Sequence, residues 1–148
     1  MIYADSSVIV KRYYGEAGTA RVRQHWGAAQ RVFTSRVAYA EVHAALARKY
    51  REGGLSAPAF RTAALAFDAE WLSYDQVLVD GTTLAHVRRL VRRHFLRGYD
   101  ALHLSAAIWL RDEIGPAIEF WVADAQLAAA ARRERLAVVN PESERSRA

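Results

Sequence analysis

Four acidic residues in this sequence lie where a carboxylate can do chemistry, and two of them follow predicted strands. Asp5 directly follows the apolar run at residues 2–4, and Asp124 lies two residues beyond Val122. Ligands of a parallel α/β sheet gather at the carboxyl ends of its strands, so acids in these positions are candidates for a site. Each Asp is also a preferred helix N-cap, which is the structural alternative.

The other two acids lie on predicted helices. Glu41 has apolar residues at nearly every helical neighbour position, where an ionised carboxylate needs a cation or its pKa rises. A solvated edge position is the alternative. Asp100 stands at the rim of an apolar stripe formed by residues 101, 104 and 108, again with capping as the alternative. His103 lies one turn further on and could touch Asp100, although a lone helical His is more often packed or exposed.

Four carboxylates that met at one sheet edge would repel one another. At ~4 Å and an effective dielectric constant near 20, each pair costs roughly 4 kcal/mol, so such a cluster is sensible only around a cation. The chain has no Cys, which excludes thiolate nucleophiles, disulfides and thiolate-held metals. Oxygen ligands then favour Mg²⁺, with Mn²⁺ as the other choice. The chemistry that follows is metal-assisted hydrolysis of a phosphodiester.

Short runs of β-forming residues alternate with segments of helical periodicity along the chain. Strands are predicted at residues 2–4, 31–34, 76–79, 119–122 and 137–139. Helices are predicted at residues 7–14, 19–28, 36–51, 57–71, 82–94, 100–113 and 125–134. This alternation predicts the α/β fold class, with a parallel sheet that is covered on both faces.

Length and charge limit the domain organisation and the partners. The 148 residues predict one domain over residues 1–140, followed by a disordered tail at 141–148 that is dense in Ser, Glu and Arg. We see no signal peptide and no long uncharged apolar stretch, and we therefore expect a cytoplasmic protein without a membrane partner. The net charge of +5 favours polyanions, although an Arg- and Ala-rich coding bias is a second source of this charge.

Four stretches together resemble the PIN-domain ribonucleases of the VapC toxin type. They are Asp5-Ser6-Ser7-Val8-Ile9-Val10-Lys11, Ser35 with Glu41, Tyr99 to Ala107, and Val122 to Leu127. The resemblance extends from residue 1 to about Pro141, and the segment from Asp100 to Leu104 is its most specific part. It implies a compact three-layer α/β/α sandwich with a central parallel sheet.

The resemblance also implies an activity and a set of partners. These are Mg²⁺-dependent RNA endonuclease activity, a VapB-type antitoxin whose C-terminal tail enters the acidic groove, and a homodimer. The family's acidic quartet matches Asp5, Glu41, Asp100 and Asp124. By this match Asp5 and Asp100 bind the metal, Glu41 binds it or orients the attacking water, and Asp124 acts through water or at a second ion. Ser6 matches a small hydroxylated position that could hydrogen-bond a carboxylate or cap a helix.

One position departs from the family pattern. Relatives commonly carry Thr or Ser two residues before the fourth acid, where this chain has Val122. Loss of a group that supports a metal ligand can cost about 10- to 100-fold in affinity or activity. A catalytically weak or inactive PIN-like module that binds nucleic acid or protein is therefore a second interpretation. A third, a phosphatase with Asp5 as nucleophile, usually needs a second Asp where Ser7 stands.

Two surfaces are candidates for binding. Residues 88–97 carry five Arg and no acid, and on a helix they form two basic rows. Because the Arg fork suits phosphate oxygens, we expect this stripe to guide RNA, with a solvated face as the alternative. The stripe consists of Arg88, Arg89, Arg92, Arg93 and Arg97. Apolar residues of the segment 36–71 could instead form a dimer seam, an antitoxin groove or plain core; they are Tyr39, Leu46, Tyr50, Phe60, Leu65 and Phe67.

Overall fold

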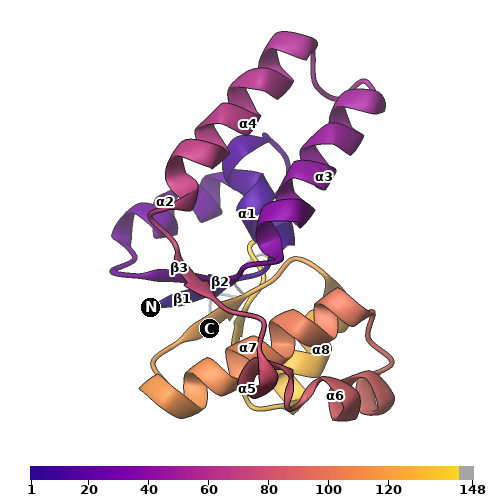
Figure 1. The fold of residues 1–148 in the computed structure, drawn as a ribbon. Helices are drawn as coiled ribbons and strands as arrows, with labels where there is room; N and C mark the ends of the chain where they lie inside the picture. The colour runs from indigo at the N-terminus through magenta and orange to yellow at the C-terminus, as the bar shows by residue number, and fades with distance from the viewer. Residues whose placement is uncertain (144–148) are drawn as a thin grey trace.

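The computed structural model describes residues 1–143, which form a five-stranded parallel sheet between two layers of helices (Figure 1). The strands are β1 (Ile2–Ala4), β2 (Val32–Ser35), β3 (Asp75–Val77), β4 (Glu119–Trp121) and β5 (Ala137–Val139). Their order is β3-β2-β1-β4-β5, and all four pairings are parallel. The winding of the sheet reverses between β1 and β4, so a crevice opens where these two strands end.

Eight helices connect the strands within the described residues. They are α1 (Ser6–Tyr13), α2 (Thr19–Ala28), α3 (Ala38–Arg51), α4 (Ala57–Trp71), α5 (Gly81–Leu84), α6 (Val87–His94), α7 (Gly98–Ile114) and α8 (Ala125–Arg133). The expected α/β class and the three-layer sandwich are confirmed. None of these helices combines the length and the apolar character that a bilayer-spanning segment needs.

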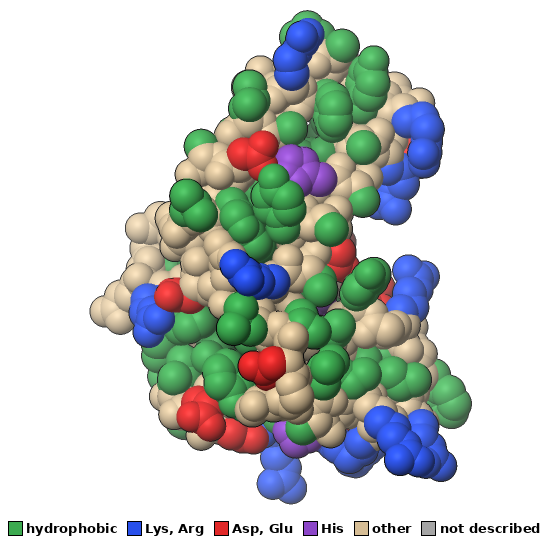
Figure 2. Space-filling model, in the orientation of Figure 1, with side chains coloured by type: hydrophobic (Ala, Val, Ile, Leu, Met, Phe, Trp, Pro, Cys, Tyr) green, Lys and Arg blue, Asp and Glu red, His purple; other side chains and the backbone are tan. Residues whose placement is uncertain are grey.

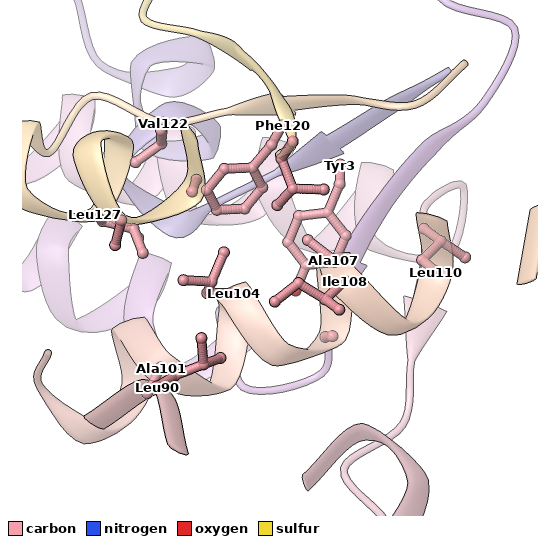
Figure 3. Close-up of a cluster of buried hydrophobic side chains, with 14 of the residues drawn as sticks. Tyr3, Leu90, Ala101, Leu104, Ala107, Ile108, Leu110, Phe120, Val122 and Leu127 are labelled. Carbon is pink, nitrogen blue, oxygen red and sulfur yellow. The ribbon is translucent and has the colours of Figure 1, made fainter. Parts of the chain in front are cut away.

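Alternation along the short strands gives the sheet two apolar faces. Tyr3 and Phe120 point into one core cluster, which α6, α7 and α8 cover (Figure 3). Ile2 and Trp121 belong to the other cluster, which α1 to α4 cover. Because successive side chains of a strand point to opposite faces, each three-residue strand supplies both cores.

Helices α3 and α4 form a hairpin that projects beyond the sheet (Figure 1). Gly53 has φ of +79° in the turn between them, a conformation that glycine adopts without the steric cost of a Cβ. The apolar residues of this segment divide into two groups. Leu46 and Phe67 are buried core residues, whereas Tyr39, Tyr50 and Leu65 are exposed.

The helix expected at residues 82–94 is broken into α5 and α6. The hydroxyl of Ser105, on α7, donates to the carbonyl of Thr83 and accepts from the backbone N–H of His86. A continuous helix would need both backbone groups for its own hydrogen bonds. The long-range contact with Ser105 therefore ends α5, which no local pattern revealed. Asp80 caps α5, as its position before a predicted helix favours.

The tail expected at 141–148 begins differently from the prediction. Pro141 is buried, and the guanidinium of Arg21 donates to the carbonyls of Asn140 and Ser143. Residues 141–143 are therefore packed against the domain, because α2 offers a donor to their backbone. Residues 144–148 of the expected tail lie outside the described part of the chain.

Candidate active site

Asp5 stands at the end of β1 and is both a helix cap and a buried carboxylate. Its Oδ2 accepts from the backbone N–H of Ser7 at 3.2 Å and from the Ser7 hydroxyl at 2.6 Å. The same hydroxyl accepts from the backbone N–H of Ala123 at 3.1 Å, which ties the end of β1 to the loop after β4. The hydroxyl that supports this carboxylate is therefore that of Ser7, whereas the sequence offered Ser6 for this role, with a helix cap as the alternative. Ser6 lines the groove beside it.

Glu41 meets a buried histidine. Its Oε1 lies 2.6 Å from Nε2 of His103, which is fully buried and lies 3.6 Å from Oδ1 of Asp5. Burial by itself would lower the pKa of His103, but the carboxylates of Asp5 and Glu41 outweigh it and raise the pKa. The imidazolium form then donates to Glu41. The sequence left open whether Glu41 has a partner or lies at a solvated edge, and this contact with His103 gives it a partner.

Behind His103 lies the phenol of Tyr3, whose oxygen is 3.1 Å from Nδ1. Burial, followed by the charges of Asp5 and Glu41, holds the pKa of Tyr3 well above its usual value, so the phenol is neutral. Tyr3, His103 and Glu41 thus form one hydrogen-bonded chain from the core to the groove. The sequence left open whether His103 is packed, exposed or in contact with Asp100, and it gave no sign of the partner Glu41, which is 62 positions away.

Asp100 and Asp124 complete the acidic set. Arg97 is the N-cap of α7, so Asp100 lies in the first turn of the helix and is not its cap. Burial, and then the charges of Asp5 and Asp124, raise the pKa of Asp100. Asp124 caps α8, since its Oδ1 accepts from the backbone N–H of Leu127 at 2.7 Å. The charges of Asp5 and Asp124 thus act on Asp100 through space.

All four acids line one groove, with a volume of about 960 Å³. Figure 2 shows it as a hollow at the right of the molecule, with acidic side chains inside and basic ones at its rims. The basic lining residues are Lys11, Arg48, Lys49, Arg51 and Arg97. Four of these five were missed by the sequence analysis. A signal existed for Arg48, because it lies two helical turns after Glu41 on the same face of α3.

The other Arg residues of the predicted stripe lie elsewhere. Arg88, Arg89, Arg92 and Arg93 line a separate, shallow hollow of about 580 Å³ on α6. Arg89 forms a bidentate pair with Glu134, both contacts being 2.9 Å. Neither Arg88 nor Arg92 is paired with a carboxylate among residues 1–143. The stripe is therefore split between two surfaces, with only Arg97 on the acidic groove.

Val122, at the position where the resemblance implies Thr or Ser, is buried in the core on the α7 side of the sheet (Figure 3). The loop that follows it is held by other groups. The Asn140 side-chain amide donates to the carbonyl of Ala123 at 3.3 Å, and the Ala123 N–H donates to Ser7. Asp124 is thus positioned through its cap and its neighbouring backbone rather than through a hydroxyl at position 122.

The chemistry of the donor set fits a hydrated Mg²⁺ or Mn²⁺ ion. Within residues 1–143, no three His, Asp or Glu side chains are already gathered as a metal shell. Mg²⁺ keeps several waters and needs only one or two direct carboxylates, so a closed shell is not required of the protein. Burial, and then the charges of Asp5 and Asp124, raise the pKa of Asp100, and a bound cation would offset these effects.

The sequence of this chain matches a known protein family. Residues 2–114 match the protein family described as PIN domain, a match that includes Asp5, Glu41 and Asp100 and ends before Asp124. Two Mycobacterium tuberculosis proteins are each 32% identical over 121 residues. They are Ribonuclease VapC45 of strain CDC 1551 / Oshkosh and Ribonuclease VapC49 of strain ATCC 25618 / H37Rv. In both cases the alignment covers 82% of this chain and 83% of the relative.

A solved structure shares the fold. The crystal structure of FitAcB from Neisseria gonorrhoeae matches with a TM-score of 0.68 at 18% sequence identity. The match covers 95% of this chain and 98% of that chain. At this identity the likeness concerns the fold alone.

Proposed function

The chain belongs to the PIN-domain family, among its VapC-type members, and from this premise we propose that it is the ribonuclease toxin of a toxin–antitoxin pair. It hydrolyses RNA phosphodiester bonds with the help of Mg²⁺, for which Mn²⁺ can substitute. The observation that carries this proposal is the convergence of four acidic side chains on one groove, where burial and neighbouring carboxylates raise the pKa of Asp100.

The acidic residues have different tasks in this proposal. Asp5 and Asp100 hold the ion, and Asp124 contributes from the N-terminus of α8, directly or through water. Glu41, fixed by its 2.6 Å contact with His103, orients the attacking water and accepts its proton. The bound ion supplies charge stabilisation to the phosphate and lowers the pKa of a coordinated water. Ser7 keeps Asp5 aimed at the groove through its 2.6 Å hydrogen bond.

The arginines bind the RNA backbone in this proposal. Arg97 lies on the acidic groove, so its guanidinium contacts phosphate near the cleaved bond. Arg88 and Arg92 extend the path over α6, whereas Arg89 and Arg93 face Glu134 and contribute less. Arg97→Ala should weaken RNA binding more than the double variant Arg88→Ala with Arg92→Ala. Each variant should also make the slope of log K for RNA binding against log salt concentration less steep. Arg36→Ala with Arg61→Ala, at exposed sites outside both hollows, is the control; an equal loss there would contradict this path.

The partners follow from the same proposal. A VapB-type antitoxin inhibits the enzyme by placing its C-terminal tail in the acidic groove, and two copies of the chain form a homodimer. The exposed apolar residues of the α3–α4 hairpin, Tyr39, Tyr50 and Leu65, are the candidates that we name for these contacts. The protein acts in the cytoplasm, where its RNA substrate is found.

The test is RNA cleavage by the purified protein with and without Mg²⁺. Wild type should cleave only with the ion, and Asp5→Asn and Asp100→Asn should each lose more than about 100-fold of the rate while keeping the fold. Circular dichroism melting checks the fold. Cleavage that survives both substitutions would overturn the proposal. RNA binding without any cleavage by wild type would favour the binding-module interpretation, which the missing hydroxyl at Val122 supports.

A further inference from the structure

A second charged cluster lies at one end of the acidic groove, around Lys11 of α1. The Lys11 side chain is only 4% exposed, and its Nζ contacts Glu16 Oε1 at 3.0 Å and Glu142 Oε1 at 2.5 Å. The other oxygen of Glu16 contacts Lys49 Nζ at 2.7 Å. All four side chains line the same groove as the catalytic acids. A buried ammonium must be paired, so Lys11 always needs an anionic partner.

The two carboxylates on Lys11 are held differently. Burial would raise the pKa of Glu16, but the hydrogen bonds from Lys49 and Lys11 outweigh it and lower the pKa below its usual value. Glu16 therefore has two cationic partners. Glu142 has only Lys11 among the described residues, and its side chain is 41% exposed. Of the two, Glu142 is the partner that another anion can replace.

The carboxylate of Glu142 reaches the groove because the backbone around it is fixed. The Glu142 N–H donates to Oδ1 of Asn140 at 2.8 Å, and the Asn140 amide donates to the carbonyl of Ala123. Pro141 packs against Gly18, where an added Cβ would come within 3.0 Å of the Pro141 carbonyl carbon. Residues 140–143 thus present an acidic side chain to Lys11 as a defined element of the groove.

We propose that Lys11 is a phosphate-binding residue of the groove and that Glu142 occupies its site until an RNA phosphate displaces it. This inference rests on the proposed function, because it names the polyanion as RNA. An RNA backbone phosphate offers the same kind of acceptor oxygens as the carboxylate that it replaces, and it carries the same single negative charge. Lys49, Arg48 and Arg51 lie on the same wall and continue the basic path from Lys11 along α3. The four charges of the cluster cancel while Glu142 is in place, and its departure leaves one net positive charge.

The test measures RNA binding in EDTA, so that no cleavage is needed. A fluorescein-labelled oligoribonucleotide should bind Glu142→Gln about five- to tenfold more tightly than wild type. Because the same phosphate contacts Lys11 in both complexes, the slope of log K against log salt should differ between the two proteins by less than about 0.7, the value for one phosphate contact with a single strand. The control is Glu113→Gln, the same charge change at an exposed residue near the end of α7, outside the groove. It should change affinity less than twofold, and equal effects of the two substitutions would overturn the proposal.

Two further measurements address Lys11 itself. Adding Lys11→Met to Glu142→Gln should return affinity to the wild-type value or below, and retention of the tight binding would contradict the assignment. Because Lys11 is buried, this double variant could fail to fold, and the wild type provides a second measurement. Its Glu142 side-chain carboxyl NMR signal should shift when RNA is added while that of Glu113 does not; an unchanged Glu142 signal would overturn displacement. These binding measurements do not depend on cleavage. If wild type does not cleave RNA, the proposed function fails, and the binding results still decide whether Glu142 is displaced from Lys11.

Discussion

Two carboxylate centres of this protein, the acidic groove and the contact around Glu134, show opposite electrostatics. The Glu134 side chain is 10% exposed and accepts two N–H groups from Arg89 and one from His94, at 2.8 to 2.9 Å. The hydrogen bonds from Arg89, and then that from His94, lower the pKa of Glu134 to about 2 although burial opposes them. Glu134 thereby links α6 to the end of α8.

In the acidic groove, by contrast, the neighbours of a carboxylate are other carboxylates, which carry the same negative charge. The pKa of Asp100 is raised by burial and by Asp5 and Asp124, although Arg97 and His103 partly offset the effect. A carboxylate that stabilises the fold, such as Glu134, accepts hydrogen bonds from cationic or N–H donors beside it. The carboxylates of the groove instead repel one another, and the rest of the fold keeps them in place. This difference separates a structural acid from a candidate catalytic one, and neither the residue type nor its position before or after a helix does so.

The largest effect on stability is expected at the Glu134 contact. Glu134→Gln removes the charge that pairs with Arg89 and His94 and should lower the free energy of unfolding by about 2 kcal/mol. That loss corresponds to a fall in Tm of roughly 4–8 °C, measured by calorimetry. RNA cleavage per folded molecule should be unchanged. Glu113→Gln, at an exposed site on α7, should stay within about 0.5 kcal/mol of wild type. Equal stability of the two variants would show that Glu134 is not a structural acid.

A smaller and opposite effect is expected at Asp100. In EDTA, Asp100→Asn should be as stable as wild type or more stable, because it relieves the repulsion from Asp5 and Asp124. Mg²⁺ at ten times its dissociation constant should stabilise wild type by about 1.4 kcal/mol, since only the folded state binds the ion. Thermal melts with and without Mg²⁺ measure this effect. An equal response of wild type and Asp100→Asn would place the ion away from Asp100.

The smallest effect is in the pH dependence, where the two centres differ in sign. The pKa of Glu134 lies below its ordinary value of 4.5, so its stabilisation is complete above that pH and is lost as pH falls from 4.5 to about 2. The pKa of Asp100 is raised, so its contribution is complete below its ordinary pKa of 3.8 and is lost as pH rises through the raised value. In urea unfolding between pH 7 and pH 3, Glu134→Gln should flatten the acid loss of stability. The free energy of unfolding of Asp100→Asn should rise relative to that of wild type as the pH approaches neutrality. If the free energy of unfolding varied with pH in the same way in all three proteins, the proposed difference between Glu134 and Asp100 would be wrong.

The fold was largely predictable because it follows local patterns. The strands expected at residues 2–4 and 137–139 are those of the structure, and the others agree within two residues at each end. The periodicity of apolar residues determines which face of each element is buried, and this signal requires no knowledge of distant partners. The single helix expected at 82–94 was wrong because it is interrupted by a contact with a residue distant in sequence. The hydroxyl of Ser105 on α7 hydrogen-bonds to the carbonyl of Thr83 and the N–H of His86.

The site was predictable in part. The positions of Asp5 and Asp124 near strand ends, and the family pattern around Asp100, selected residues that the structure brings to one groove. The partners of these acids were not visible. Ser7 instead of Ser6 supports Asp5, and His103 pairs with Glu41, because those contacts depend on how helix faces are turned toward one another.

The sequence by itself determined the fold class and the absence of thiol chemistry, and it named the acids that could bind a metal. Only the tertiary structure decided which acids face one another, which are neutralised, and which cations line the groove with them. The physical reason is the range of the forces. Helix and strand formation depends on neighbours along the chain, whereas the energy of a charge depends on distances through space. Lys11 and Glu142, far apart in sequence and 2.5 Å apart in the groove, show that difference most directly.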